Sequence, residues 1–343
     1  MRFYDIQIYD QKGVLFRQYS SLKNGVFNPG AHMVEFDIQR FGESTPKGES
    51  HITIWGVSPQ EMQQAQQNMF GMTIKMFAGM SRGLPLSNPS QKGLVLEGSI
   101  LQAFGNWQGT ELRLDLIVVS GPVSSTNMKP MAPLNLTFPW NTGQQMSTAL
   151  AQCFQTLGGG YSHNINISSR LILPFSRPMF CGALEQLAKD LKLFSKTIIK
   201  DPDYTGVEIA IVNGKEIRVW DNDYNNHSDK TSLKSATYRN GHPTKIEFTD
   251  LIGQPTWIRF GTVSVPCVMR ADIQVGDRIL MPKNSRPMIQ AFSYSNYRNE
   301  SAFTGEFIVQ SVRLVGNSRQ PDGSSWVTII DASPSKELAK NDR

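Results

Sequence analysis

The sequence predicts a mainly β protein with an α+β insert, in which two β-barrel-like domains flank a small α+β domain. Residues 1–125 read as short β-rich or alternating segments separated by Gly, Pro, Asn or Ser. Residues 126–235 contain two stretches with helical periodicity and a hairpin signal. Residues 236–335 return to strand-like segments, and residues 336–343 form a polar tail. These three observations define the expected domains.

Seven strands are expected in the first domain. Leu112, Leu114 and Leu116 alternate with Arg113 and Asp115, which predicts one buried and one wet face. The expected strands are FYDIQIYD, VLFRQYSSL, HMVEFDIQRF, HITIW, MTIKMFAG, GLVLEGSILQAF and ELRLDLIVV. Because closure removes exposed edges, this number of strands favours a closed or nearly closed antiparallel barrel.

One short helix interrupts these strands. The segment ITIWGVSPQEMQQAQ begins as a strand and changes to a helical period after its Gly-Val-Ser-Pro. Ser58, Pro59 and Glu61 fit the N-cap, the first helical position and the N3 acid of a capping box. The helix is predicted from Pro59 to about Asn68 and ends at Gly71. We expect it to plug or cover the barrel, through the apolar residues Met62, Ala65 and Met69.

The middle of the chain follows a Pro-, Ser- and Asn-rich stretch, Ser120–Pro133, which is typical of a linker. TGQQMSTALAQCFQTL predicts a helix, and the glycines at 158–160 fit a helix stop better than a phosphate loop. HNINI predicts a short strand. A second helix is expected after Pro178, over about Phe180 to Phe194, with an apolar stripe formed by Leu184, Leu187, Ala188 and Leu191.

A hairpin and a second β-rich region complete the expected elements. VEIAIVNGKEIRVWD predicts a hairpin that turns at Asn213-Gly214. Four further segments read as strands with glycine and proline turns: PTKIEFTDLIGQPTWIRFGTVSVPCVMR, DIQVGDRILMP, FTGEFIVQSVRLVG and SSWVTIIDA. The sequence shows no internal repeat strong enough to assign.

Composition restricts the class of protein. Hydrophobic residues make up 39% of the 343 residues and charged residues 18%, which indicates a folded chain. No apolar run is long enough for a membrane span, and the N-terminus MRFYDIQIYD lacks the features of a secretory signal, so we expect folding in a cytoplasm. The net charge of +5 comes without a basic run, so charge alone gives little support to nucleic-acid binding.

The sequence predicts no catalytic, cofactor-binding or metal-binding residue, no cofactor and no enzymatic activity. It contains no GxSxG, HExxH or P-loop motif, and its acidic residues show no locally marked catalytic pair. Cys153, Cys181 and Cys267 are too few and too far apart for a disulfide framework or a cysteine zinc site, and buried apolar roles are expected for Cys153 and Cys181. The histidines have no metal-ligand spacing and are expected in turns or on the surface: His32, His51, His163, His227 and His242.

The best candidate for a metal site is DNDYNNHSD, residues 221–229. Asp221, Asp223 and Asn225 match the first three oxygen ligands of an EF-hand loop. The match then fails, because position six is Asn226 instead of Gly and position twelve is Ser232 instead of Glu. A turn with local side-chain hydrogen bonds is the favoured interpretation.

Two long segments resemble a known family. ITIWGVSPQEMQQAQ, followed by MTIKMFAGM and GLPLSNPSQKGLVLEGSILQAFGNWQGTELRLDLIVV, is similar to the first domain of the baseplate hub proteins of contractile-tailed bacteriophages. There a strand leads through a cap into a short helix, and further strands follow. IGQPTWIRFGTVSVPCVMRADIQVGDRILMP resembles the C-terminal barrel of that family. The resemblance covers nearly the whole chain, and its motifs are structural.

This resemblance implies a homotrimeric hub with two barrel-like domains per chain. Such a ring adapts a hexameric tail tube to a trimeric central spike, since six similar surfaces lie on one side and three-fold symmetry is kept on the other. The implied partners are the tail tube protein and the central spike protein, with the tape-measure and baseplate wedge proteins as further candidates. DNA passes only transiently, and no membrane integration is expected. The implied location is the virion, after assembly in the host cytoplasm.

Two other functions stay open at this point. A carbohydrate- or peptidoglycan-binding module, with or without cell-wall-degrading activity, would use the α+β domain. A nucleic-acid-binding barrel would combine aromatic and basic residues on strands, as fragments such as FRQYSSLK and IRVW do. Aromatic residues in a barrel core are the favoured interpretation of these fragments.

Overall fold

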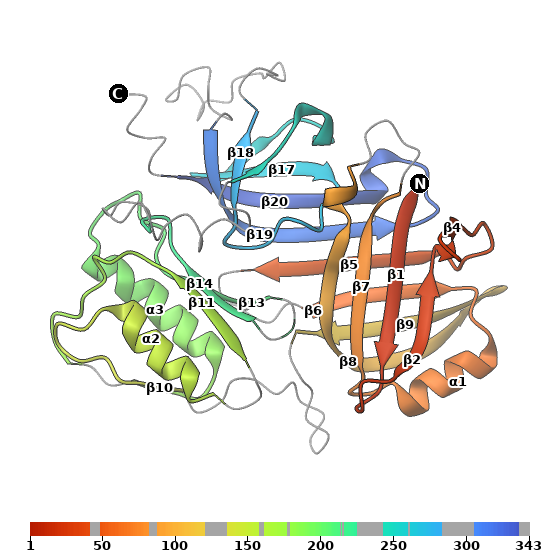
Figure 1. Ribbon diagram of the computed structural model, residues 1–343, viewed down its shortest axis with the longest axis horizontal. Helices are drawn as coiled ribbons and strands as arrows, with labels where there is room; N and C mark the ends of the chain where they lie inside the picture. The colour runs from red at the N-terminus through yellow and green to blue at the C-terminus, as the bar shows by residue number, and fades with distance from the viewer. Residues whose placement is uncertain are drawn as a thin grey trace.

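The structure, a computed structural model, confirms a mainly β protein with large antiparallel sheets and a small α+β unit beside them (Figure 1). It describes residues 1–41, 49–81, 88–120, 136–157, 161–176, 179–212, 214, 216–224, 243–259, 261–282 and 305–335. The predicted linker lies almost wholly outside these residues, as do the glycines at 158–160, Pro178, Asn213 and the polar tail. The predicted domain boundaries therefore stay a prediction.

All seven strands expected in the first third are present. They are β1 (Arg2–Tyr9), β2 (Leu15–Ser20), β5 (Val34–Phe41), β6 (Glu49–Trp55), β7 (Thr73–Met80), β8 (Gly93–Gln108) and β9 (Glu111–Val119). A small ribbon, β3 (Leu22–Lys23) with β4 (Val26–Phe27), follows β2. A short 3₁₀ turn, η1 (Pro89–Gln91), precedes β8. Alternating burial along β5 and β9 gives the predicted buried and wet faces.

The last third adds strands to the same sheet. They are β15 (Thr244–Lys245), β16 (Thr256–Arg259), β17 (Thr262–Val268), β18 (Arg278–Met281), β19 (Gly305–Asn317) and β20 (Trp326–Pro334). Two 3₁₀ turns accompany them, η2 (Phe248–Asp250) and η4 (Gly323–Ser325). The strand order is β16-β17-β20-β19-β5-β6-β9-β8-β7-β1-β2, with β18 also beside β19 and β15 beside β18.

The two β-rich thirds meet where β19 pairs with β5, a junction that we call the seam. The strands are antiparallel, and the pairing runs from Ser311 opposite Phe41 to Asn317 opposite Glu35. On the buried side, the ring of Phe36 packs edge-on against Trp326, with ring centroids 5.1 Å apart. One hydrophobic core consequently contains residues of both thirds, such as Ile38 and Leu314. Nothing in the sequence alone predicted that the two β-rich thirds would share one sheet.

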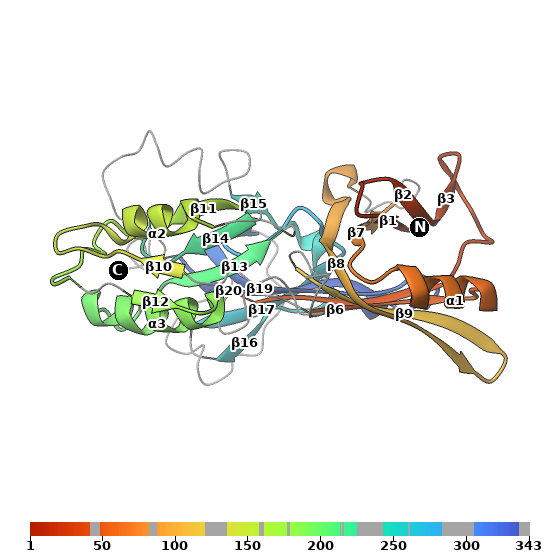
Figure 2. The ribbon, with the colours of Figure 1, turned by 90° about the horizontal axis from the view of Figure 1, so that it is seen from below.

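The sheet also curls over itself. The first half of β8 pairs with β7, the second half pairs with β9, and a β-bulge lies between Ile100 and Gln102. Such a bulge bends a strand and increases its twist. In Figure 1, β1 and β7 run across the direction of β5 and β6, and Figure 2 shows them as a separate layer on one side of that part of the sheet. The core lies between the layers.

The chain contains a repeat of topology that its sequence does not show. The order β5-β6-β9-β8-β7, which we call the N unit, recurs as β16-β17-β20-β19-β18, the C unit, and all neighbours in both units are antiparallel. The bulge recurs as well. In β8 it falls before Gln102, where the pairing with β7 ends, and in β19 before Ser311, just after the pairing with β18 ends. The two β-rich thirds are therefore built on one plan.

Helix α1 (Pro59–Asn68) has the predicted bounds and the predicted cap. The Ser58 hydroxyl accepts a hydrogen bond from the Glu61 amide at 3.2 Å, and the Glu61 carboxylate accepts one from the Ser58 amide at 2.9 Å. Ala65 and Met69 are fully buried, and Met62 is partly buried against the same core. The helix therefore covers one end of the core, as the sequence predicts (Figure 1).

Replacing Ser58 with Ala is expected to lower the free energy of unfolding by about 1 kcal/mol, because the first turn of α1 loses its side-chain acceptor. Ser58→Gly, which lets water reach the free amides, is expected to cost less than about 0.5 kcal/mol. Urea unfolding of both variants measures the difference. Equal losses in the two variants would show that the cap contributes nothing specific.

The α+β unit has its own core. Its strands are β10 (Leu136–Phe138), β11 (Ser162–Asn166), β12 (Met179–Cys181), β13 (Glu208–Val212) and β14 (Glu216–Trp220), and its helices are α2 (Met146–Gln155) and α3 (Leu184–Ile198). Strands β13 and β14 form the predicted hairpin, and β11 adds to β14 in parallel. The apolar stripe of α3 is buried as predicted. None of the helices in the described segments combines the length and apolar character needed to cross a bilayer.

The start of α3 differs from the prediction. We expected a helix from about Phe180, but residues 179–181 form β12, which pairs with β10, and the helix begins at Leu184 and continues to Ile198. Cys181 is buried by this pairing, whereas Phe180 faces outward. Alternation over three residues was too short a signal to separate a strand from the first turn of a helix.

Candidate assembly surface

At equivalent places in the two units, a strand pairs with a neighbour on one side only, within the described segments. Residues 102–108 of β8 pair with β9 on one side, and β16 pairs with β17 on one side. Within the described segments no strand pairs with the other side of either. In the repeat, β8 corresponds to β19 and β16 corresponds to β5, which are the two strands of the seam. Such edges expose unpaired N–H and C=O groups that can accept another strand.

Apolar side chains are exposed at both of these edges. Ile258 of β16 is 52% exposed, and Trp107 near the end of β8 is 73% exposed. Phe104 and Trp257, on the same two edges, are half-buried. Large apolar groups at an open strand edge lose unfavourable contact with water when a partner covers them. These edges therefore have the composition of an interface.

The position of Gly105 in β8 is set by α1. A Cβ atom built on Gly105 would lie 2.3 Å from the Met62 Cε atom, so only glycine lets α1 approach the strand this closely. Beside it, the β8–β9 hairpin continues past the helix (Figure 2), and Trp107 is the next-to-last residue of β8 before the turn. The Trp107 indole N–H donates to the Gly109 carbonyl at 2.6 Å, which holds the ring against its own turn.

The wet face of the sheet is acidic although the chain is basic overall. Across β20, β19, β5, β6 and β9 it carries six carboxylates and two arginines. The carboxylates belong to Glu35, Asp37, Glu49, Glu111, Asp115 and Asp331, and the guanidinium groups to Arg113 and Arg313. Since the net charge of the chain is +5, this face has the opposite sign from the protein as a whole.

The carboxylates at the seam are held by neighbours. Asn317 donates to Glu35 at 2.7 Å, and Arg313 donates to both oxygens of Asp37, at 3.0 and 2.7 Å. Partial burial opposes ionisation of Asp37, but the hydrogen bonds and charge of Arg313 prevail and lower its pKa. A shallow hollow lies here, with His51 also in its lining. An ionised, salt-bridged carboxylate is poorly suited to general acid chemistry, so Asp37 does not have the properties of a general acid.

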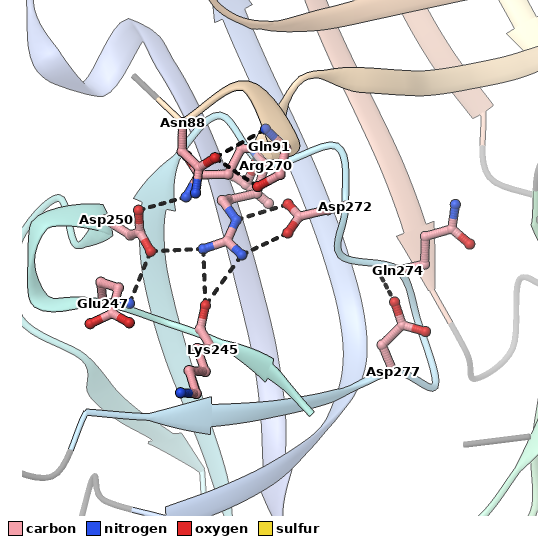
Figure 3. A network of polar contacts seen from close by, with 11 residues as sticks. Asn88, Gln91, Lys245, Glu247, Asp250, Arg270, Asp272, Gln274 and Asp277 are labelled. Carbon is pink, nitrogen blue, oxygen red and sulfur yellow. Dashed lines mark hydrogen bonds and ion pairs between the residues drawn. The ribbon is translucent and has the colours of Figure 1, made fainter. Parts of the chain in front are cut away.

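A buried polar network ties the first third of the chain to the last (Figure 3). The side chain of Arg270 is 3% exposed and pairs with Asp250 at 2.8 Å and with Asp272 at 2.7 Å. Gln91, from the turn before β8, donates to the other oxygen of Asp250 at 2.7 Å. The Gln91 carbonyl in turn accepts from the Ala271 amide at 2.9 Å. Since the guanidinium holds both carboxylates and Gln91 holds one of them, the network is a structural joint between the two thirds.

The cysteines and described histidines have structural surroundings. All three cysteines are buried and free, and burial raises the pKa of Cys153 to about 11 and of Cys267 to about 12. Such thiols stay protonated and unreactive near neutral pH. His51 is exposed, and His32 lies with Nδ1 2.9 Å from the Trp55 carbonyl oxygen. His227 and His242 lie outside the described residues. Within the described segments no group of His, Cys, Asp and Glu side chains could hold a metal ion.

Asp221 and Asp223, the described part of the candidate metal loop, form one local hydrogen bond of the kind interpreted from the sequence and several bonds to distant parts of the chain. Asp221 is buried and accepts from the Ser168 amide at 2.9 Å, the Tyr204 hydroxyl at 2.9 Å and the Asp223 amide at 3.0 Å. Asp223 accepts from Arg170 at 3.2 Å. Asn225, Asn226 and Ser232 lie outside the described residues. The two carboxylates thus join β14 to the segment after β11.

The Asp221 carboxyl group is expected to make stability depend on pH. Burial raises its pKa to about 7 in spite of its three donors. In the unfolded chain the group loses its proton near pH 4. Between about pH 4 and 7 the folded state holds a proton that the unfolded state has lost. The free energy of unfolding of the wild type, relative to that of Asp221→Asn, should therefore fall as the pH rises through that window. Urea midpoints at pH 4 to 8 test this, and a pH-independent difference would contradict it.

The fold of this chain is similar to that of solved structures of other proteins. No family model and no curated protein matches the chain. The crystal structure of the 43 kDa tail protein of prophage MuSo2 from Shewanella oneidensis matches with a TM-score of 0.49 and 6% identity, covering 98% of both chains. The tail protein from Neisseria meningitidis MC58 matches with a TM-score of 0.47 and 9% identity, covering 96% of both chains.

Proposed function

We propose that this chain is a structural component of a phage tail baseplate, a homotrimeric hub that adapts a six-fold tail tube to a three-fold central spike. The observation that carries the proposal is the repeated five-strand unit. Each chain joins an N unit to a C unit through the seam, and in the described part of the chain the strands that correspond to the seam strands, residues 102–108 of β8 and β16, pair with a strand on one side only. A contact that repeats head to tail in this way forms a ring when the rotation between successive copies closes, and we propose closure after three chains.

Symmetry explains why such a ring suits the task. Three chains with two similar units each offer six similar surfaces, which match a six-fold tube. The α+β unit occurs once per chain, so the same ring also has a three-fold surface that can hold a trimeric spike. The resemblance of the two β-rich segments to the baseplate hub family supports these partners. Tape-measure and wedge proteins are further candidates, and the location is the virion after assembly in the host cytoplasm.

The acidic wet face supports a channel that DNA crosses without being retained. We place this face toward the lumen, because β1, β2 and β7 cover the opposite side of the sheet (Figure 2). Proteins that hold DNA neutralise its phosphates with lysine and arginine. A surface with six carboxylates and two arginines instead repels a polyanion, and so favours its passage. The proposed role is structural and requires no catalytic group.

The test is the mass and symmetry of the purified full-length protein. Light scattering after gel filtration should give three times the mass of one chain, and negative-stain averages should show a ring with six lobes. The protein alone and the protein co-expressed with the spike of the same tail are compared. A monomer in both preparations would overturn the proposal, and lysis of purified peptidoglycan by that monomer would favour a cell-wall module.

A further inference from the structure

We propose that residues 102–108 of β8 in one copy pair antiparallel with β16 of a second copy, in the register of the seam. The inference rests on the proposed function, since it assumes that copies join into a ring. It goes further by naming the two strands and the residues that face each other. Three observations support it: the repeat of topology, the bulges that fix its register and the side chains at the two edges.

The first step is the correspondence between β8 and β19. Both strands change partner at a bulge, and the residue after the bulge is Gln102 in β8 and Ser311 in β19. Counting along the strands from that point, Asn106 corresponds to Val315. In the seam, residues 311–317 of β19 pair with β5. The corresponding residues 102–108 of β8 have no such partner in the described part of the chain.

The second step is the correspondence between β5 and β16. In each unit, the residue after the bulge pairs with a residue of the next strand, and that residue pairs in turn with a residue of the strand beyond. This last residue is His51 of β6 in the N unit and Ser264 of β17 in the C unit, so His51 and Ser264 correspond. Asp37 of β5 lies opposite His51, and Thr256 of β16 lies opposite Ser264. Thr256 therefore corresponds to Asp37.

The register of the contact between copies follows from these two steps. In the seam, Val315 lies opposite Asp37. Replacing each residue by its counterpart places Asn106 of one copy opposite Thr256 of the next. The strands run antiparallel, as in the seam. Strand β2 also has a free edge, but it lies outside the repeated order and has no counterpart in the C unit, so it is not part of this contact.

The side chains at the two edges complement each other in this register. Ile258, which lies at a bulge of β16 two residues after Thr256 and is 52% exposed in the single chain, would be covered by the end of β8 that carries Phe104. On the buried side, Gly105 comes opposite Trp257. A glycine opposite a large aromatic group also occurs in the seam, where Gly316 lies opposite Phe36. In the seam the small residue leaves room for the Phe36 ring, whereas the space at Gly105 is taken by Met62 of α1.

The experiment uses cysteines in the full-length protein. Asn106→Cys and Thr256→Cys chains are prepared separately, mixed and oxidised. Residues directly opposite in an antiparallel pair have Cα atoms about 4.5–5.5 Å apart, which suits a disulfide. The mixture should give covalent dimers, and each variant alone should give none, because the two edges of the contact differ. The native cysteines are buried and should not interfere.

Two controls fix the register. Gln102→Cys mixed with Thr256→Cys is displaced by four residues, about 14 Å along the strand, and should cross-link at least about tenfold less. The pair Asp37→Cys and Val315→Cys in one chain should form an internal disulfide, which calibrates the reaction on the seam. Ile258→Glu should reduce the ring fraction at least about tenfold, whereas Leu193→Glu, an exposed apolar residue of α3, should leave it unchanged.

The outcomes separate this inference from the proposed function. A three-chain ring in which Asn106→Cys and Thr256→Cys cross-link no better than the displaced pair would overturn the register and leave the hub intact. Cross-linking of either variant with itself would show a contact between like edges and would also overturn the inference. A protein that stays monomeric with and without its spike would overturn both proposals.

Discussion

Replacing Arg270 with Met is expected to lower the free energy of unfolding by about 3–5 kcal/mol, because removal of one partner from a buried ion pair leaves uncompensated charge. The Arg270 guanidinium is shared by Asp250 and Asp272, and both of its terminal nitrogens also approach the Lys245 carbonyl oxygen at 3.3 Å. Without the arginine, the Asp250 carboxylate keeps only hydrogen bonds from Gln91 and the Glu247 amide. Urea unfolding at neutral pH measures the loss.

A matched control is the surface pair of Arg313 with Asp37. Its arginine side chain is 48% exposed, so Arg313→Ala should cost no more than about 1 kcal/mol. Combining Arg270→Met with Asp250→Asn should recover part of the stability, since the buried charge of Asp250 is removed. If Arg270→Met costs no more than Arg313→Ala, the network does not join the two thirds as described.

Replacing Gly316 with Ala is expected to lower the free energy of unfolding by about 1–3 kcal/mol, because a methyl group is forced into a filled part of the core. A Cβ atom on Gly316 would lie 2.2 Å from the Phe36 Cε1 and Cζ atoms. The Phe36 ring cannot easily move away, since it packs against Trp326 on the other side. Because the two residues face each other across the seam, the strain acts directly on the joint between the units.

Gly323 provides the control for this effect. A Cβ atom there meets nothing within 4 Å, so Gly323→Ala should change stability by less than about 0.5 kcal/mol. A smaller ring should relieve the clash, and Gly316→Ala combined with Phe36→Leu should therefore be more stable than the sum of the two single changes. Strict additivity in this double-mutant cycle would contradict the packing described for the seam.

Local signals in the sequence were sufficient for most of the elements. Alternation in ELRLDLIVV predicts β9, and the Ser-Pro-x-Glu pattern predicts α1 together with its capping box, because both depend on residues close in the chain. The apolar stripe of α3 was correct although its start was not. Here the pairing of β12 with β10, which are far apart in sequence, decided the local conformation.

The seam and the repeat could not be predicted in this way. Strands β5 and β19 are more than 260 residues apart, and no local pattern specifies which strand a free edge will accept. Corresponding residues such as Asn106 and Val315 differ in polarity, so the repeat is visible in the strand order and the bulges and not in the residue types. For Arg270 a weak signal existed, since Asp272 follows two residues later, but Asp250 and Gln91 join it only through the fold.

The seam also affects how a ring of this protein would depend on concentration. Because the N and C units belong to one chain, they meet at the high effective concentration that a covalent connection provides. Only the contacts between chains then respond to dilution. In the proposed ring, assembly depends on the third power of chain concentration, whereas six separate units would require the sixth power. A tail that needs few copies of its hub could thus complete the ring while the protein is still scarce.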